Sequence, residues 1–282
     1  MAVLLGVLVA ASFGSGDFLG GRASRRAPTL TVLMVAQATA VIGAVVVCLF
    51  VGARVGTHDI VFGLLAGAVN IVGVGLLYQG LAVGRMGVVA PITSVVAATV
   101  PVAWGIANGE RPSVLIIVGV VFAVVAVTLI TRQPDEASDG SSAETGVVWA
   151  VVAGLALGSS LILYLQTSPD SGLWPVLAAR VAAFVLVAGA LAVVAARGVR
   201  LPFPQGADRR LALGAGALDV TASTLLLLAV REGLIVVVAP MAALAPGFTV
   251  VLARFVLGEQ LHAAQRVGLL FALAGLVMVA LG

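Results

Sequence analysis

Three ionisable side chains interrupt otherwise apolar stretches of the sequence: Asp17 in GSGDFLG, Arg180 in VLAARVAAF and Asp219 in GALDVTAST. A charged residue inside such a stretch costs roughly 2.5–3.5 kcal/mol when the segment enters a bilayer, so it indicates a group with a function or a partner. Acidic and basic groups of this kind could bind a charged solute or carry a proton. The alternative is a structural ion pair between Arg180 and either aspartate.

Two neutral polar residues occupy corresponding places in the other half of the chain. Asn70 lies 149 residues before Asp219, and Gln37 matches Arg180 when TVLMVAQATAV is aligned with WPVLAARVAAF. Polar groups at equal depth in both halves favour a shared cavity. Interhelical hydrogen bonding is the alternative, because membrane helices also use such side chains for packing. We expect the four residues Gln37, Asn70, Arg180 and Asp219 to bind substrate, and Asp219→Asn to abolish activity without lowering expression.

Prolines add two further candidate residues to the same site, Pro91 and Pro240. A proline within a helix has no N–H, so Pro91, Pro240 and Pro246 are expected to leave three carbonyls without their usual partners, those of Gly87, Val236 and Ala242. In a membrane such carbonyls are tolerated only against protein or a water-filled cavity. Pro91 and Pro240 are therefore predicted to line the cavity wall. A packing kink without solute contact is the other interpretation.

Proton coupling is a separate expectation, placed on Asp219 and Asp17. Withdrawal from water disfavours the charged form of a carboxyl group, which lets it exchange a proton near neutral pH. A nearby arginine opposes this effect, so the distance from Asp219 to Arg180 decides the outcome. Asp17 lies closer to the end of its apolar stretch than Asp219 does.

Several kinds of chemistry are poorly supported by the residue types present. All 15 basic residues are arginine, so lysine Schiff-base chemistry and a phosphate-binding lysine are excluded. Cys48 is the single cysteine, and His58 and His262 lie far apart, so we predict no catalytic residue set, no metal site and no cofactor. The arginines are scattered and the net charge is only +3, which argues against nucleic-acid binding.

Composition identifies the elements that must position these residues. Hydrophobic residues make up 61% of the 282 positions and charged residues 10%, whereas soluble domains are about half apolar and one quarter charged. A membrane crossing takes about 20 mostly apolar residues. Ten segments satisfy this requirement: 2–20, 30–51, 60–81, 87–107, 113–131, 146–166, 173–196, 211–229, 234–257 and 264–281. We expect an all-α integral membrane protein with ten transmembrane helices.

An internal repeat divides the ten segments into two groups of five. Pro91 and Pro240 are 149 residues apart, and so are Glu110 and Glu259. The polar stretch 132–145 is predicted to be a flexible linker between a first repeat at 1–131 and a second at 146–282. Because five is odd, the second unit must enter the membrane from the opposite side. The sequence therefore predicts two inverted repeats around a central cavity.

Several motifs together resemble the EamA group of the drug/metabolite transporter (DMT) superfamily. The resemblance covers nearly the whole chain. It is carried by Ala90-Pro91, Asn108-Gly109-Glu110-Arg111, Ala239-Pro240, Pro246, Leu257-Gly258-Glu259-Gln260, Tyr78-Gln79-Gly80-Leu81-Ala82 and Gly14-Ser15-Gly16-Asp17-Phe18. In the last of these, Phe13 stands where the family has Trp. The resemblance implies export or exchange of small metabolites, amino acids or drugs through a cavity lined by the first four helices of each repeat.

The expected function is accordingly secondary transport of a small molecule by alternating access. Its partners are a small-molecule substrate and the lipid bilayer of a bacterial cytoplasmic membrane, in which the chain acts as a monomer or homodimer. An intramembrane enzyme is one alternative, but it would need a nucleophile–base set or paired acids with histidine within the spans. A membrane sensor or scaffold is another, although the longest loop has only about 14 residues.

Two packing features are also predictable. The GxxxG pairs Gly63/Gly67 and Gly154/Gly158 permit close helix contact, and we expect packing within the protomer. Tyr78 falls near a predicted span end, together with Tyr164, Trp104, Trp149 and Trp174. Aromatic residues at such positions commonly lie at the membrane–water interface, so interfacial anchoring is expected for all five.

Basic residues are divided unevenly between the loops at the two ends of the predicted bundle. Loops on the linker side contain nine arginines, and those on the side of the termini contain three. The nine are Arg22, Arg25, Arg26, Arg85, Arg132, Arg197, Arg200, Arg209 and Arg210. The positive-inside rule therefore favours both termini outside the cell, whereas the family resemblance implies cytoplasmic termini. We follow the charge count.

Overall fold

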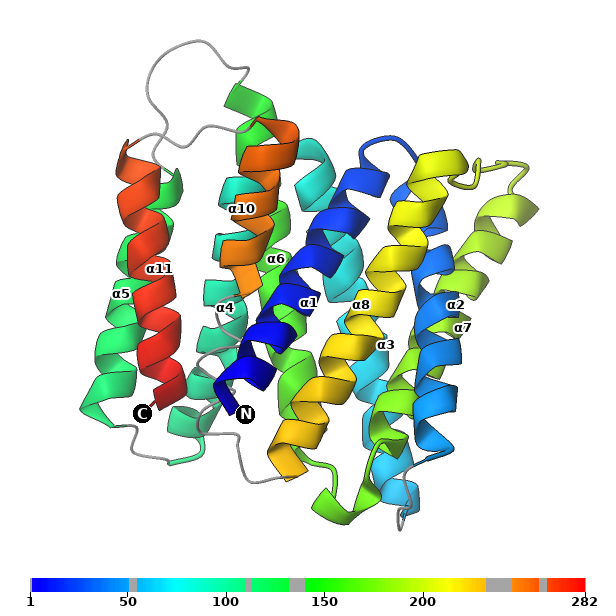
Figure 1. The fold of residues 1–282 in the computed structure, drawn as a ribbon, viewed down its shortest axis with the longest axis horizontal. Coiled ribbons are helices and arrows are strands. Elements are labelled where there is room, and N and C mark those ends of the chain that lie inside the picture. The colour runs from blue at the N-terminus through cyan, green and yellow to red at the C-terminus, as the bar shows by residue number, and fades with distance from the viewer. Residues whose placement is uncertain are drawn as a thin grey trace.

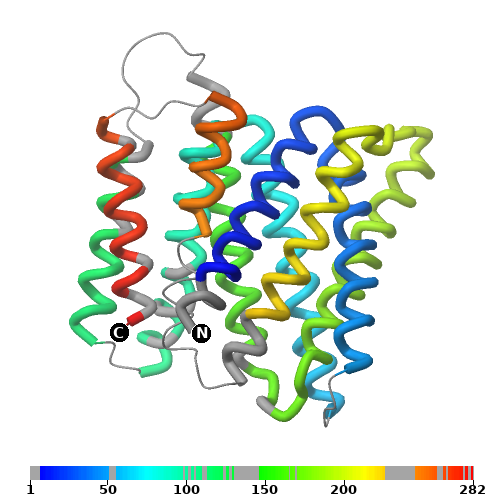
Figure 2. The backbone as a smooth tube through the Cα atoms, viewed as in Figure 1, coloured from blue at the N-terminus to red at the C-terminus, as the bar shows by residue number. Residues whose placement is uncertain are grey.

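The computed structural model describes residues 2–50, 55–109, 113–131, 140–231, 245–258 and 263–281. Within these ranges the chain forms ten α-helices and one short 3-10 helix (Figures 1 and 2). The first half contains α1 (Ala2–Ser24), α2 (Thr29–Cys48), α3 (Thr57–Val83), α4 (Met86–Ala107) and α5 (Val114–Thr131). The second contains α6 (Gly140–Leu165), η1 (Pro169–Ser171), α7 (Trp174–Ala196), α8 (Gly206–Arg231), α10 (Ala245–Leu257) and α11 (Ala263–Leu281).

Long apolar helices make this an integral, multi-pass membrane protein. Among the described residues, four segments are long and apolar enough to cross a bilayer: Thr29–Cys48, Thr57–Val83, Gly146–Tyr164 and Trp174–Ala196. Large apolar side chains remain exposed on the outer helices, with Ile42 66%, Val114 76% and Phe255 79% accessible. An outer surface of this kind is solvated by lipid tails, whereas in water it would aggregate.

Helices of one half pack mainly against helices of the other half. The helix α3 contacts α6 and α7, and α8 correspondingly contacts α1 and α2. The pairs α2–α7, α4–α10 and α5–α11 also join the two halves. In Figure 1, α1 and α6 run in opposite directions along the bundle, with both termini at its lower end. Each of these contacts between a helix of the first half and one of the second is therefore matched by a contact between the two equivalent helices of the opposite halves.

Glycine positions show the same correspondence at the level of single residues. A Cβ atom on Gly67 of α3 would collide with the backbone of Ala179 on α7. A Cβ atom on Gly216 of α8 would likewise collide with the backbone of Ala36 on α2. Ala36 and Ala179 immediately precede Gln37 and Arg180. The polar residues matched in the alignment are thus held by equivalent helix crossings.

The GxxxG pairs pack within the protomer, as expected. Gly63, like Gly67, lies directly against α7, where its nearest neighbours are backbone atoms of Pro175. Gly154 and Gly158 lie against Thr93, Val96, Ala97 and Val100 of α4. Because glycine has no side chain, the helix backbones approach closely at all four positions.

Two expectations about helix boundaries need correction. The helix α6 begins at Gly140, so the last six residues of the predicted linker are helical. The helix α8 begins at Gly206 rather than 211. Pro246 is the second residue of α10 as described, and Ala242, whose carbonyl it was expected to leave without a partner, lies outside the described residues.

Candidate functional site: a buried ion pair beside a small polar pocket

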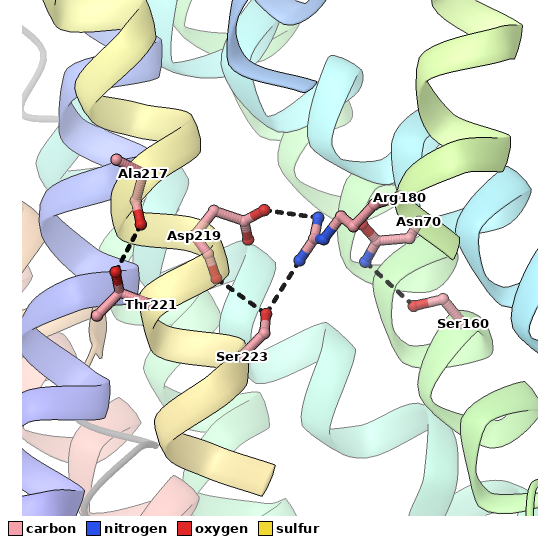
Figure 3. A network of polar contacts seen from close by, with 7 residues as sticks. All are labelled: Asn70, Ser160, Arg180, Ala217, Asp219, Thr221 and Ser223. Atoms are coloured by element: carbon pink, nitrogen blue, oxygen red, sulfur yellow. Dashed lines mark hydrogen bonds and ion pairs between the residues drawn. The ribbon is translucent and has the colours of Figure 1, made fainter. Parts of the chain in front are cut away.

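An ion pair joins α7 to α8 in the interior of the bundle (Figure 3). The Nη1 atom of Arg180 lies 2.5 Å from Oδ2 of Asp219. Arg180 is 7% accessible, and 26% of the Asp219 side chain is accessible. The two residues were proposed from sequence as either a site or a structural pair. The structure brings them into direct contact.

A serine completes this network. The Nη2 of Arg180 donates to the hydroxyl oxygen of Ser223 at 3.0 Å, and that hydroxyl donates to the carbonyl oxygen of Asp219 at 2.9 Å (Figure 3). Ser223 lies one turn after Asp219 on α8, so both residues face α7. Two of the three guanidinium nitrogens are therefore engaged, while the buried Nε atom has no hydrogen-bond partner among the described residues. The guanidinium orientation is thus set largely by α8.

A small pocket lies on the other side of Asp219, where α1, α2, α3 and α8 meet. Its polar lining consists of Asp17, Gln37, Tyr78 and Asp219, with Phe13 and Val74 among the apolar lining residues. The space that the centre of a water molecule can reach is about 20 Å³. This volume suits one or two waters and is too small for a metabolite. We call it the polar pocket.

Gln37 is the least accessible of the polar residues predicted from sequence. It is 3% accessible, lines the polar pocket, and its Oε1 atom has no donor among the described residues. A buried acceptor without a donor costs about 1–3 kcal/mol. Such atoms are uncommon in native structures and call for an explanation.

Asn70 occupies a different place from its counterpart Asp219. Its Nδ2 donates to the hydroxyl oxygen of Ser160 on α6 at 3.4 Å, and that hydroxyl donates to the carbonyl oxygen of Leu157 at 2.7 Å (Figure 3). Asn70 is absent from the lining of the polar pocket. The interhelical hydrogen bond that was the alternative interpretation is therefore present for this residue.

The predicted proline positions are only partly described. Pro91 is fully buried within α4, and it does not line the polar pocket. Pro240 lies outside the described residues, as do Glu110 and Glu259.

Tyr78 is the site residue that sequence reasoning placed wrongly. Instead of anchoring at the membrane interface, it is 4% accessible and faces the polar pocket. Its ring packs against Gly20, where a Cβ atom would collide with the phenol. A signal was present, because Gly20 and Gly21 in α1 leave room for large side chains of α3 to pack deeply. Ser160 and Ser223 were also missed, since serine is common in membrane helices.

Hydrogen bonds join the two halves of the chain at each end of the bundle. At one end, Asp59 of α3 accepts hydrogen bonds from the backbone N–H groups of Ser168 at 2.7 Å and Gly56 at 3.0 Å. At the other end, the hydroxyl of Thr31 on α2 donates to the carbonyl oxygen of Pro202, before α8, at 3.0 Å. Each contact links connections from different halves of the chain.

Comparison with known proteins identifies the family of this arrangement. The EamA-like transporter family matches residues 1–132 and 144–281. No curated protein matches the chain. A solved structure described only as "Crystal structure of protein" matches with a TM-score of 0.63 and 14% identity, covering 98% of this chain and 95% of that one; it is similar in fold. Because the family match spans both halves, the chain belongs to the EamA-like transporter family, a DMT-type transporter family, and contains two EamA repeats.

Proposed function

We propose that this protein is a secondary transporter that carries a small metabolite, amino acid or drug across the cytoplasmic membrane of a bacterial cell. The movement is alternating access, in which two inverted five-helix repeats rock against each other. The observation that carries the proposal is the buried Arg180–Asp219 ion pair beside the polar pocket. In a chain of this family, charged groups at the interface between repeats are suited to binding solute rather than to holding a rigid fold.

The hydrogen bonds between the two halves at each end of the bundle support alternating access. Asp59 joins the α2–α3 and α6–α7 connections, and Thr31 joins the α1–α2 and α7–α8 connections. Breaking one set of contacts while keeping the other would open the polar pocket to one side only. The small volume of the pocket corresponds to an occluded state in this cycle.

Proton coupling belongs to the same proposal and involves Asp17 and Asp219. Both carboxylates line the polar pocket, and among the described residues of the bundle interior Asp219 forms an ion pair with Arg180. Asp17 is therefore better suited to accept a proton, while Asp219 holds Arg180. Substrate contacts are assigned to Gln37, Arg180 and Asp219, with Asn70, Pro91 and Pro240 becoming accessible when the repeats move.

The transport proposal is tested in proteoliposomes. Vesicles are loaded with a defined mixture of amino acids, amines, nucleosides and sugars, and compounds released over time are identified by mass spectrometry. We expect at least one compound to leave faster than from protein-free vesicles, and an imposed pH gradient to change its rate. Release that ignores the gradient would remove proton coupling but leave transport. No protein-dependent release would contradict transport of these classes.

The orientation of the chain is a separate prediction. The α1–α2, α3–α4 and α7–α8 connections lie at the upper end in Figure 1, opposite both termini, and the arginine-rich loops belong to this end. Positively charged loops tend to stay in the cytoplasm. We therefore expect a reporter that fluoresces only in the cytoplasm to remain dark when fused after Gly282. A bright fusion would show that the charge count does not govern this protein.

A further inference from the structure

The polar pocket carries an unbalanced negative charge. Two carboxylates, Asp17 and Asp219, contribute to its lining, and none of the residues that line it is basic. Arg180 lies behind Asp219 and forms an ion pair with that carboxylate. One negative charge, on Asp17, therefore remains to be neutralised by whatever occupies the pocket. An isolated carboxylate withdrawn from water is strongly disfavoured, so Asp17 is stabilised either by a bound proton or by a positively charged occupant that replaces it.

The hydrogen-bonding groups of the pocket also require a donor. Gln37 lines the pocket and is 3% accessible, and its Oε1 atom has no donor among the described residues. Ionised carboxylates accept hydrogen bonds and donate none. A water molecule could donate to Gln37, but it would not balance the charge of Asp17. A protonated primary amine supplies both the charge and three N–H donors.

The size and walls of the pocket agree with an ammonium group. Its volume of about 20 Å³ holds one or two water-sized groups, and an ammonium group is of that size. Tyr78 and Phe13 contribute aromatic rings to the lining, and aromatic faces attract cations. A quaternary ammonium has no N–H donor and is too large for this space.

We propose that the polar pocket binds the protonated primary amino group of the transported solute, between Asp17, Gln37 and Asp219. This inference rests on the transport function proposed above and assigns its substrate class. The rest of the solute extends out of the pocket once the repeats open. Asp17 supplies the opposite charge, and Gln37 supplies an acceptor that selects amines over cations that lack N–H groups.

The test uses thermal unfolding of the purified full-length protein in detergent, with methylammonium chloride as the probe. Tetramethylammonium chloride, sodium chloride and potassium chloride are compared at the same ionic strength. A ligand that binds only the folded state raises the unfolding temperature with its concentration. We expect methylammonium to stabilise the protein and the other three salts not to. Equal stabilisation by all four would overturn the proposal, and stabilisation by sodium alone would identify a sodium site instead.

Variants locate the binding. Asp17→Asn is expected to weaken methylammonium binding by about tenfold or more, as for loss of a charge-assisted hydrogen bond. Gln37→Met keeps nearly the same volume, removes the side-chain amide together with its acceptor oxygen, and should weaken binding by about fivefold. Asp208→Asn removes an acid that pairs with the exposed Arg26 and does not line the polar pocket, so it serves as the matched control. Wild-type affinity in Gln37→Met and Asp17→Asn alike would refute the site.

The vesicle experiment separates this inference from the function on which it rests. Protein-dependent release of amines supports both. Protein-dependent release of only neutral or anionic compounds would leave the transporter proposal intact and overturn the amine site. Methylammonium binding that depends on Asp17, without release of any compound, would support the site and count against transport.

Discussion

Asp219→Asn is expected to abolish transport while the protein still accumulates in the membrane. The asparagine keeps the shape of the side chain and an oxygen that can accept from Arg180, which lies 2.5 Å from the carboxylate. It removes the charge that holds the guanidinium and lines the polar pocket. The measurement is the release rate from proteoliposomes together with the amount of folded protein. Full transport activity in this variant would remove Asp219 from the mechanism.

A double variant decides whether the ion pair is structural or functional. Asp219→Ala leaves Arg180 as a buried charge without its partner, which should lower the free energy of unfolding by about 3 kcal/mol. In Arg180→Met/Asp219→Leu both charges are gone, and apolar replacements of a buried pair are often neutral for stability. We expect recovered stability without recovered transport. If the double variant transported normally, the pair would be only structural.

Gly67→Ala and Gly216→Ala are expected to lower the yield of folded protein sharply. The added Cβ atoms would collide with the backbones of Ala179 and Ala36, which cannot move as a side-chain tip can. Forcing extra atoms into such a contact costs about 1–3 kcal/mol, and both positions adjoin the crossing that holds the site. The measurements are the unfolding temperature in detergent and the amount of monodisperse protein after extraction.

Gly189→Ala provides the matched control for this pair. Gly189 lies on the exposed side of α7, and a Cβ atom there would meet no atom within 4 Å. Alanine exceeds glycine in helix propensity by about 1 kcal/mol in water, so this variant should be as stable as the wild type or more so. Equal stability in all three variants would show that the α3–α7 and α2–α8 crossings tolerate separation.

The repeat positions illustrate how far sequence reasoning reached. The spacing of 149 residues between Gly67 and Gly216, and the alignment of Gln37 with Arg180, correspond to matching helix crossings in the structure. The all-helical class and the family could also be predicted from the sequence, because the length of the apolar segments and the order of the motifs are properties of the chain itself. The start of α6 at Gly140 could not be predicted, because the polar residues there are compatible with either a loop or a helix end.

The site residues show where such reasoning stops. Arg180, Asp219, Gln37 and Asp17 attracted attention because polar groups are costly in apolar segments. Their partners could not be inferred, because an arginine reaches across a helix interface in a direction that depends on its rotamer and on the crossing angle. Asn70 follows the same periodicity as Asp219, yet it turns to Ser160.

Local chemistry alone therefore determines that this chain crosses the membrane repeatedly, that its halves are related, and which polar residues are too costly to face lipid. Tertiary packing decides that Asp17 and Asp219 share one pocket, that Tyr78 enters it, and that Arg180 lies behind it. The physical reason is that insertion of a segment into the membrane depends on the length of its apolar stretch, which is a property of one helix alone. Contact between side chains depends on how closely two helices approach, and at Gly67 and Gly216 that approach is set by atoms far away in the sequence.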